Sequence, residues 1–253
     1  MINLSSHYIA STTYVLNFKK TERQIRLQQA QAEEAFGGMI TAQSQQTNLP
    51  DQVDPKQPRI IFQKPNNSIA ISQNSCQWQV VFDNENASID RELQKIEDEI
   101  QEFYKRAIIF RPKKDFGSAG LVFEINFPSN SSALDLQKYL HNTFIKTKPI
   151  GEVASIQINM GFELNGYFLT ISAAAYESRR IEIKKDDFTT REDIDMKNYP
   201  VTETGINLKL DINSLPKTKK DPTFEPENPT DLIEITKKFF GEQLENILGL
   251  KIN

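Results

Sequence analysis

Cysteine, histidine and long apolar runs are scarce in this chain of 253 residues, and each scarcity excludes a class of protein. Cys76 is the single cysteine, so there is no intramolecular disulfide, no Cys-x-x-Cys redox pair and no thiolate metal cluster. His7 and His141 form no His-x-x-x-His pair, which removes the zinc-hydrolase signature. No apolar run approaches the ~18–20 residues that a membrane-spanning helix needs, so we expect no membrane partner.

Surplus positive charge is also missing, since 30 Lys and Arg stand against 34 Asp and Glu for a formal net charge of −4. A mild negative balance disfavours general attraction to nucleic acid or anionic membranes, although it is compatible with a local basic patch. The first twenty residues lack a basic segment followed by an apolar one, so we expect no secretory signal and a location in the reducing cytoplasm.

The composition is that of a globular protein, with 38% hydrophobic and 25% charged residues. A chain of this length buries roughly three quarters of its unfolded surface. Sixteen Phe residues supply large pieces for a core. We therefore expect residues 1–253 to form one domain.

Residue patterns predict strands and helices in alternation. Runs rich in β-branched and aromatic residues predict strands at 8–18, 59–64, 68–73, 76–83, 120–128, 152–164, 167–185 and 202–213. Helices are predicted at 21–36, 88–107, 132–145 and 230–248. Segments 37–58 and 214–229 are rich in Pro, Asn and Gln or Lys and predict loops, the first of them an ordered surface loop.

Two local signals are the clearest. Asn165-Gly166 joins two predicted strands, and this dipeptide favours a tight antiparallel hairpin because both residues accept positive φ. In segment 88–107, with Ser88 as its expected N-cap and Asp90 in its first turn, apolar residues recur at spacings of three and four: Ile89, Leu93, Ile96, Ile100, Phe103 and Ala107. Asn228 is the expected cap of the final helix.

These elements predict an α+β fold, in which an antiparallel sheet carries the helices 88–107, 132–145 and 230–248 on one face. Tight links between the strands at 59–83 exclude parallel crossovers there. The order of elements allows two similar strand-strand-strand-helix halves, 58–107 and 152–250, but the two halves differ too much in sequence to decide whether the chain is duplicated.

The stretch 167–187 carries Arg179, Arg180, Lys184 and Lys185 at the end of a long strand. From residue 177 to residue 187, four basic residues are balanced by four acidic ones, whereas a strip that neutralises phosphates needs surplus positive charge. We interpret it as a solvated strand end, which bulges or leaves the sheet near 177–180 because Arg179 falls on the apolar face.

No motif in the chain assembles a catalytic or metal site, so we expect no catalytic residue, no metal ligand and no cofactor. Ser118 lies between glycines without the Gly-x-Ser-x-Gly spacing. The carboxylates at 97–99, with Glu92 and Glu102, lie on the solvated side of a helix, and the acidic loop 186–195 lacks calcium-loop spacing. Cys76 has no activating neighbour. Trp78 and Tyr176 could anchor a partner, but such aromatic residues more often lie in the core.

Three segments carry a likeness to known proteins: "SIAISQNSCQWQVVF" (68–82), "GINLKLDIN" (205–213) and "DLIEITKKFFGEQLENILGLK" (231–251). Together they resemble a sporadically distributed bacterial protein family of about 250 residues with no assigned activity. The likeness covers less than a quarter of the chain and brings no catalytic residue. It implies a bacterial cytoplasmic accessory protein.

Three functions stay open. The first is a non-catalytic protein that binds another protein or itself, as a chaperone-like, antitoxin-like or defence-system accessory subunit does; this choice leans away from an enzyme. The second is a metal-dependent hydrolase or nuclease with dispersed Asp and Glu. The third is an RNA-binding protein, which requires the fold to gather the basic residues Arg111, Lys113, Lys114, Arg179 and Arg180 on one surface.

Overall fold

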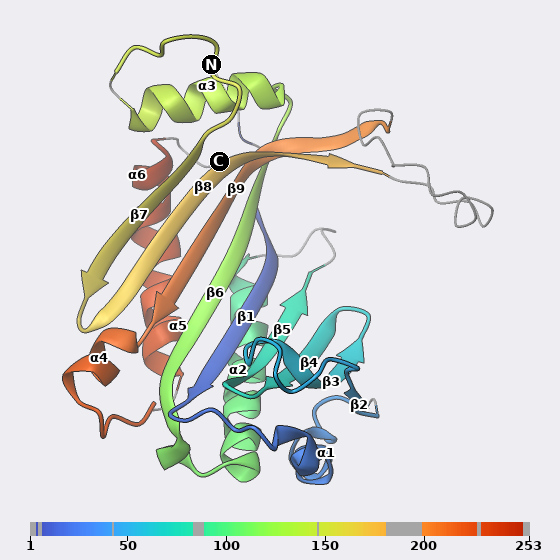
Figure 1. Cartoon of the computed structure of the whole chain (residues 1–253). Coiled ribbons are helices and arrows are strands. Elements are labelled where there is room, and N and C mark those ends of the chain that lie inside the picture. Colours follow the sequence, from blue (N-terminus) through green and yellow to red (C-terminus); the bar gives the residue numbers. More distant parts are fainter. Residues whose placement is uncertain are drawn as a thin grey trace.

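The protein is built on one antiparallel sheet of nine strands in the order β2-β3-β4-β5-β1-β6-β9-β8-β7 (Figure 1). The computed structural model describes residues 4, 7–41, 43–82, 89–145, 147–180, 199–226 and 229–249. All pairings between neighbouring strands are antiparallel, which confirms the predicted sheet type and the meander at 59–83.

The strands other than β2 agree with the predicted segments, with differences at the ends, whereas β2 lies within 37–58, which was predicted as a loop. The strands are β1 (Tyr8–Phe18), β2 (Gln45–Gln46), β3 (Pro58–Lys64), β4 (Asn67–Ser72), β5 (Ser75–Val81), β6 (Phe116–Ser129), β7 (Gln157–Leu164), β8 (Tyr167–Arg179) and β9 (Val201–Asn213). β6 begins four residues earlier than predicted and β7 begins five residues later. The turn between β7 and β8 has Asn165 at φ 52° and Gly166 at φ 80°, as the Asn-Gly signal requires.

The helices are α1 (Gln29–Phe36), preceded by the 3₁₀ turn η1 (Ile25–Gln28), then α2 (Ile89–Phe110), α3 (Ala133–Phe144), α4 (Leu215–Lys220), α5 (Thr230–Lys238) and α6 (Leu244–Leu248). Another 3₁₀ turn, η2 (Lys113–Asp115), precedes β6, and the π-helical segment η5 (Phe239–Gln243) joins α5 to α6. The short helix α4 was predicted as loop, so that prediction was wrong. No helix in the described part of the chain is long and apolar enough to cross a membrane.

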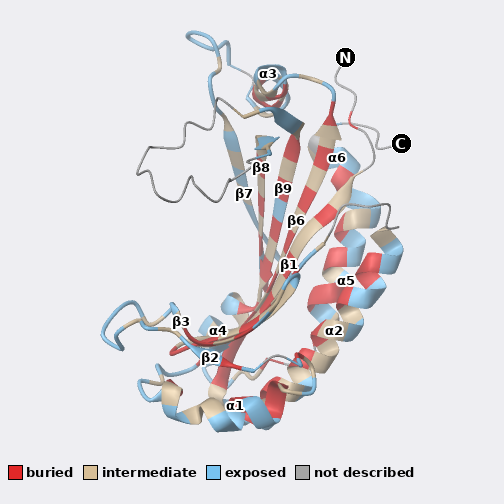
Figure 2. Cartoon of the chain, turned by 90° about the vertical axis from the view of Figure 1, so that its right-hand side faces the viewer, coloured by how far each residue is buried: buried red, intermediate tan, exposed pale blue. Residues whose placement is uncertain are grey.

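Helices α2, α3 and α5 cover one face of the sheet, as predicted, and the core lies between these helices and the strands (Figure 2). Phe103 of α2 shows how tightly they pack, because its ring lies edge-on to Tyr14 of β1 at 5.9 Å and stacks on Phe36 of α1 at 5.5 Å. The π-helical segment turns both Phe239 and Phe240 toward the core, and Phe240 meets Phe123 of β6 at 5.9 Å.

The order of elements repeats along the chain. Apart from the short elements β2 and α4, the first half runs β1, α1, β3, β4, β5 and α2, and the second runs β6, α3, β7, β8, β9 and α5. In the sheet the halves run β3-β4-β5-β1 and β6-β9-β8-β7, so β1 and β6 form the central antiparallel pair. The predicted halves 58–107 and 152–250 omit these two strands, and an internal duplication stays a prediction.

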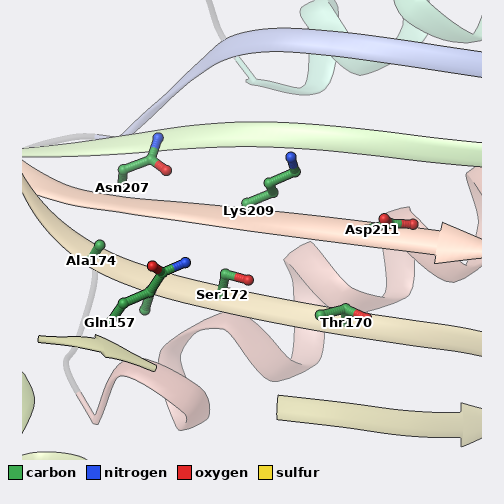
Figure 3. Close-up of a pocket in the computed structure, with 8 residues that line it drawn as sticks. Gln157, Thr170, Ser172, Ala174, Asn207, Lys209 and Asp211 are labelled. Atoms are coloured by element: carbon green, nitrogen blue, oxygen red, sulfur yellow. The ribbon is translucent and has the colours of Figure 1, made fainter. Parts of the chain in front are cut away.

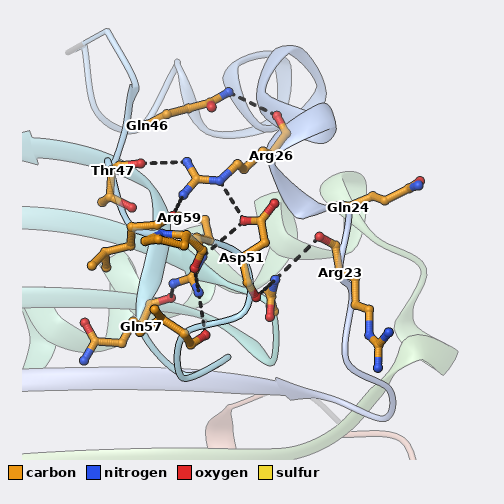
Figure 4. A network of polar contacts seen from close by, with 12 residues as sticks. Arg23, Gln24, Arg26, Gln46, Thr47, Asp51, Gln57 and Arg59 are labelled. Carbon is orange, nitrogen blue, oxygen red and sulfur yellow. Dashed lines mark hydrogen bonds and ion pairs between the residues drawn. The ribbon is translucent and has the colours of Figure 1, made fainter.

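Residues 47–57, within the segment predicted as a loop, are held by two arginines that donate to their backbone (Figure 4). Arg26 donates to the carbonyls of Thr47 (2.7 Å) and Leu49, and its Nε bonds Asp51 at 2.8 Å. Arg59 is fully buried beneath the loop. This network explains how a segment so poor in apolar residues keeps one conformation.

Several predictions about chain ends and charges fall outside the described residues: the caps Ser88 and Asn228, the continuation of the basic strand through Lys184 and Lys185, and the acidic loop 186–195. The part of this strand that is described behaves as predicted. Its pairing with β9 shifts register between Ser178 and Arg179, which is the expected bulge.

Candidate functional site: the open face of the sheet

In the described part of the chain, no helix covers the face of the sheet opposite α2, α3 and α5, and this face is polar. We call the side chains of β1, β6, β9, β8 and β7 on it the open face. Because side chains alternate along a strand, residues paired across the strands form rows. The rows follow the register and read Tyr8, Asn126, Asn207, Ala174, Gln157; then Ser11, Glu124, Lys209, Ser172, Asn159; then Thr13, Val122, Asp211, Thr170, Gly161. Amides and hydroxyls dominate these positions.

The middle of the open face holds a shallow pocket of about 320 Å³ between β9, β8 and β7 (Figure 3). Its polar lining consists of Gln157, Thr170, Ser172, Asn207, Lys209 and Asp211. Lys209 is exposed and forms no ion pair with a described residue. The pocket therefore presents one cation and one carboxylate among groups that can both donate and accept hydrogen bonds.

A chain of hydrogen bonds borders this pocket and holds the first row in place. Asn207 donates to Asn126 at 2.8 Å, and Asn126 donates to the hydroxyl of Tyr8 at 2.9 Å. Tyr8 and Tyr176 both donate to one carboxylate oxygen of Glu203, at 2.9 and 2.6 Å. Five side chains from four strands are thus oriented before any partner arrives.

The phenols in this chain of bonds stay protonated at neutral pH. Burial raises the pKa of Tyr176, and the carboxylate of Glu203 raises it further. Burial also raises the pKa of Tyr8. The predicted partner anchor Tyr176 is therefore a half-buried donor at the rim of the open face, whereas Trp78 is fully buried in the core.

On the open face two serine hydroxyls donate hydrogen bonds, and that of Ser11 goes to the carboxylate of Glu124 at 3.2 Å. Ser172 donates to the amide oxygen of Asn159 at 2.7 Å, and an amide cannot take its proton. Ser118, the serine between glycines, is buried and accepts from Asn17 at 3.1 Å. Within the described residues, no three His, Cys, Asp or Glu side chains lie close enough together to hold a metal ion. The arrangement can bind by hydrogen bonding.

The basic residues named for RNA binding are not brought together. Arg111 lies over the ring of Phe18 at 4.5 Å and bonds Glu22 at 3.0 Å, next to the start of β6. Arg179 pairs with Glu177 near the other end of the sheet (Figure 1). The length of β6 separates the two groups by about 40 Å.

A basic cluster that contains Arg111 and Lys114 of the predicted set forms where β1 ends and β6 begins. Lys19, Lys20, Arg111 and Lys114 line a pocket of about 470 Å³ together with Glu22 and Asp115. The backbone of Lys19 donates to that of Asp115 at 2.8 Å, which joins the two segments. The hydroxyl of Thr218 in α4 donates to the carbonyl of Gly117, and this contact brings the lysines of α4 to the same end of the molecule.

The acidic helix face is occupied by ion pairs. Glu97 pairs with Lys237 of α5 at 2.5 Å, Glu102 with Arg106 at 2.7 Å, and Glu99 with Lys95 at 3.8 Å. Glu92 differs, since it is buried and its Oε2 has no hydrogen-bond partner among the described residues. Burial raises the pKa of the Glu92 carboxyl.

His7 and Asp90 line one further pocket, of about 540 Å³, between the start of β1, α2 and the π-helical segment. The ring of His7 stacks on Phe127 at 5.1 Å, and burial lowers its pKa. Cys76 is buried and unpaired, and burial raises the pKa of its thiol.

Comparison with known proteins gives no identity. No family model matches the chain, and neither the curated proteins nor the solved structures contain a match. The resemblance to an unassigned bacterial family therefore stays a prediction.

Proposed function

We propose that this chain is a non-catalytic protein of the reducing cytoplasm whose open face binds another protein. The observation that carries the proposal is a broad sheet face that helices leave uncovered and that displays rows of oriented amide and hydroxyl groups. Antiparallel sheets commonly keep one face for solvent or for a partner.

The size of the face favours a macromolecule over a small ligand. The five strands of the open face span about 19 Å at ~4.8 Å spacing, and eight residues of strand span about 26 Å. The resulting ~500 Å² per partner corresponds to a small, transient protein interface, because each partner contributes ~800 Å² to a standard one. A small-molecule site, by contrast, is usually a deep and mostly apolar cavity.

The chemistry of the face favours a protein surface. Amide and hydroxyl groups both donate and accept, so they match the mixed donors and acceptors of a polypeptide. Glu124, Lys209 and Asp211 lie near one another with both signs of charge, which disfavours a polyanion at this place. The same composition suits a hydrated interface in which water bridges many of the polar contacts.

The test is purification of the tagged protein from its native host, followed by mass spectrometry and light scattering, for the wild type and two variants. Lys209→Glu reverses the charge at the centre of the open face. Lys105→Glu makes the same change at an exposed position of α2 on the helical side. We expect a stoichiometric protein partner that the Lys209→Glu variant loses and the Lys105→Glu variant keeps. Equal recovery by both variants, or no protein partner, would contradict the proposal.

A second candidate, RNA binding, is favoured by the cluster at the ends of β1 and β6. Segments 19–23, 111–115 and 217–221 carry nine basic and three acidic residues in a chain whose net charge is −4. Such a local surplus attracts phosphates by counterion release. We expect single-stranded RNA to bind with an affinity that falls with salt and drops in a Lys19→Glu, Lys114→Glu double variant. The matched control is Arg179→Glu at the far end of the sheet, and binding that 0.5 M salt leaves unchanged would refute the electrostatic argument.

A further inference from the structure

The two edges of the sheet are protected very differently. One edge is β2, which has only two residues. The other is β7, which has eight residues (QINMGFEL) and, among the described residues, no strand beside its outer side (Figure 1). Natural edge strands are usually short, bulged, covered, or marked with Lys or Pro, because unpaired backbone groups attract another strand. β7 is long, has no Lys, Arg or Pro, and pairs with β8 without a register shift.

The turn to β8 fixes which backbone groups of β7 point outward. In a two-residue hairpin the residues that flank the turn, here Leu164 and Tyr167, form a hydrogen-bonded pair. Hydrogen-bonded and non-hydrogen-bonded pairs then alternate, so the even-numbered residues of β7 bond β8. The odd-numbered residues direct their N–H and C=O groups outward: Gln157, Asn159, Gly161 and Glu163.

The side chains of β7 alternate with the same period. The even-numbered residues Ile158, Met160, Phe162 and Leu164 share the face of the helices, where Met160 pairs with Ile171 of β8. Phe162 is 46% exposed and Leu164 is 40% exposed, although both are apolar. The sheet thus ends in an apolar row that is partly uncovered, beside a row of backbone groups that no described residue pairs.

A second copy of β7 can pair with the outward backbone groups and cover the apolar side chains at the same time. Two copies that meet across a two-fold axis perpendicular to the sheet keep their helices on the same face, so even residues must oppose even residues. Centring the pair on Met160 uses the whole strand. It places Ile158 opposite Phe162 and Ile156 opposite Leu164 on the helical face, and Asn159 opposite Gly161 and Gln157 opposite Glu163 on the open face.

The charges permit this pairing. Glu163 is the single ionisable residue of β7, and in this register it faces the neutral amide of Gln157 and not its own copy. Four pairs of odd-numbered residues each exchange two backbone hydrogen bonds, which gives about eight bonds. A strand of unrelated sequence could use the backbone groups alone, whereas a second copy also matches the apolar row along its full length.

We propose that β7 pairs with β7 of a second copy of this chain, antiparallel and centred on Met160, so that two nine-stranded sheets become one. This interface uses the edge of the sheet and is independent of the proposed role of the open face. The Lys209→Glu variant is therefore expected to pair normally, so failure of one proposal leaves the other standing.

Light scattering on the purified full chain over a concentration series gives the first test. We expect a dimer that dissociates on dilution. Asn159→Pro removes one outward N–H and is expected to weaken the dimer at least tenfold, whereas Asn159→Ala removes the same side chain, keeps the N–H and weakens it less. Phe162→Lys is expected to weaken it as well, and Ile109→Lys, at an exposed apolar position of α2, is the matched control. Circular dichroism checks that each variant is folded.

Disulfide trapping tests the register itself. Opposed residues of a non-hydrogen-bonded pair have Cα atoms about 4.5 Å apart, within disulfide reach. Met160→Cys is therefore expected to form a covalent dimer on mild oxidation, while Phe162→Cys, about 13 Å from its own copy, is not. The double variant Ile158→Cys, Phe162→Cys is expected to form a covalent dimer. The natural Cys76 is not expected to react, because it is buried. A wild type that stays monomeric at every concentration, or equal trapping by both single variants, would overturn the proposal.

Discussion

Replacing Arg59 by methionine is the most direct test of how the loop at 47–57 is held. Arg59 is fully buried and donates from Nη1 to the carbonyl of Gln57 at 2.8 Å and from Nη2 to those of Val53 at 2.8 Å and Pro50 at 3.2 Å. Its Nε lies 3.5 Å from Asp51, where the attraction is ionic without a hydrogen bond. Methionine has a similar length and no donor, so Arg59→Met removes all of these interactions.

The expected loss of unfolding free energy is about 3–5 kcal/mol. Hydrogen bonds from a charged donor contribute roughly 1.5–3 kcal/mol each, which for three bonds sets an upper range of about 4.5–9 kcal/mol. In the variant the loop can open so that water bonds its carbonyls, and this makes the loss of unfolding free energy smaller than the upper range. The net figure is then close to the ~3–5 kcal/mol typical of removing one partner of a buried polar pair.

Urea unfolding measures the loss, because the single tryptophan, Trp78, is fully buried and reports unfolding by its fluorescence. Trypsin cleavage after the exposed Lys56 reports loop opening and is expected to accelerate in the variant. Arg23→Met, at an exposed arginine of the same region, is the control and is expected to change stability by less than about 0.5 kcal/mol. A loss below about 1 kcal/mol in Arg59→Met with unchanged cleavage would refute this account of the loop.

Other substitutions test the core, the turn and one buried carboxyl. Phe103→Ala is expected to cost about 3–5 kcal/mol in urea unfolding, since it empties a site between Tyr14 and Phe36. Gly166→Ala is expected to cost about 1–2 kcal/mol, because the residue has φ 80°. Burial raises the pKa of Glu92, so its ionisation opposes folding as pH rises through the folded pKa. Glu92→Gln should therefore raise the urea midpoint at pH 7 and leave it unchanged at about pH 3.5, where Glu92 is protonated in both states; a similar gain at both pH values would contradict this reasoning.

The elements predicted well are those whose signal is local. The apolar spacing of 88–107 and the Asn165-Gly166 turn need no distant partner, and both match the structure. The start of β6 was missed because Phe116-Gly117-Ser118-Ala119 has little strand propensity of its own. Ser118 and Ala119 are nevertheless paired with β1, residues distant in sequence, so the pairing and not the local sequence makes them a strand.

The helix α4 was missed for a related reason. Its sequence, LPKTKK, has no apolar stripe. Ser214, just before it, bonds both backbone groups of Ala119, and Thr218 bonds the carbonyl of Gly117, so contacts with β6 hold the segment in place. No periodicity in the sequence reveals such contacts.

Part of the open face could be predicted from the sequence. Alternation in "INLKLDIN" already places Asn207, Lys209 and Asp211 on one side of a strand. Which side the helices leave uncovered depends on packing, and the neighbours Asn126, Thr170 and Ser172 come from other strands whose order in the sheet the sequence does not state. Arg111 and Arg179 are far apart because Arg111 lies just before the start of β6 and Arg179 lies at the end of β8, and both strands run antiparallel to β9.

The central pairing of β1 with β6 has a consequence for synthesis on the ribosome. β3, β4, β5 and β1 belong to residues 8–81, so the first half-sheet can assemble early, and β6 emerges about 35 residues later to cover the free side of β1. The far side of β6 must then wait for β9, which begins 72 residues after β6 ends. At ~5–20 residues per second that interval lasts about 4–14 s. During it the nascent chain exposes a 14-residue strand with three Phe residues, so we expect β6 to be the segment on which chaperones act and at which misfolding begins.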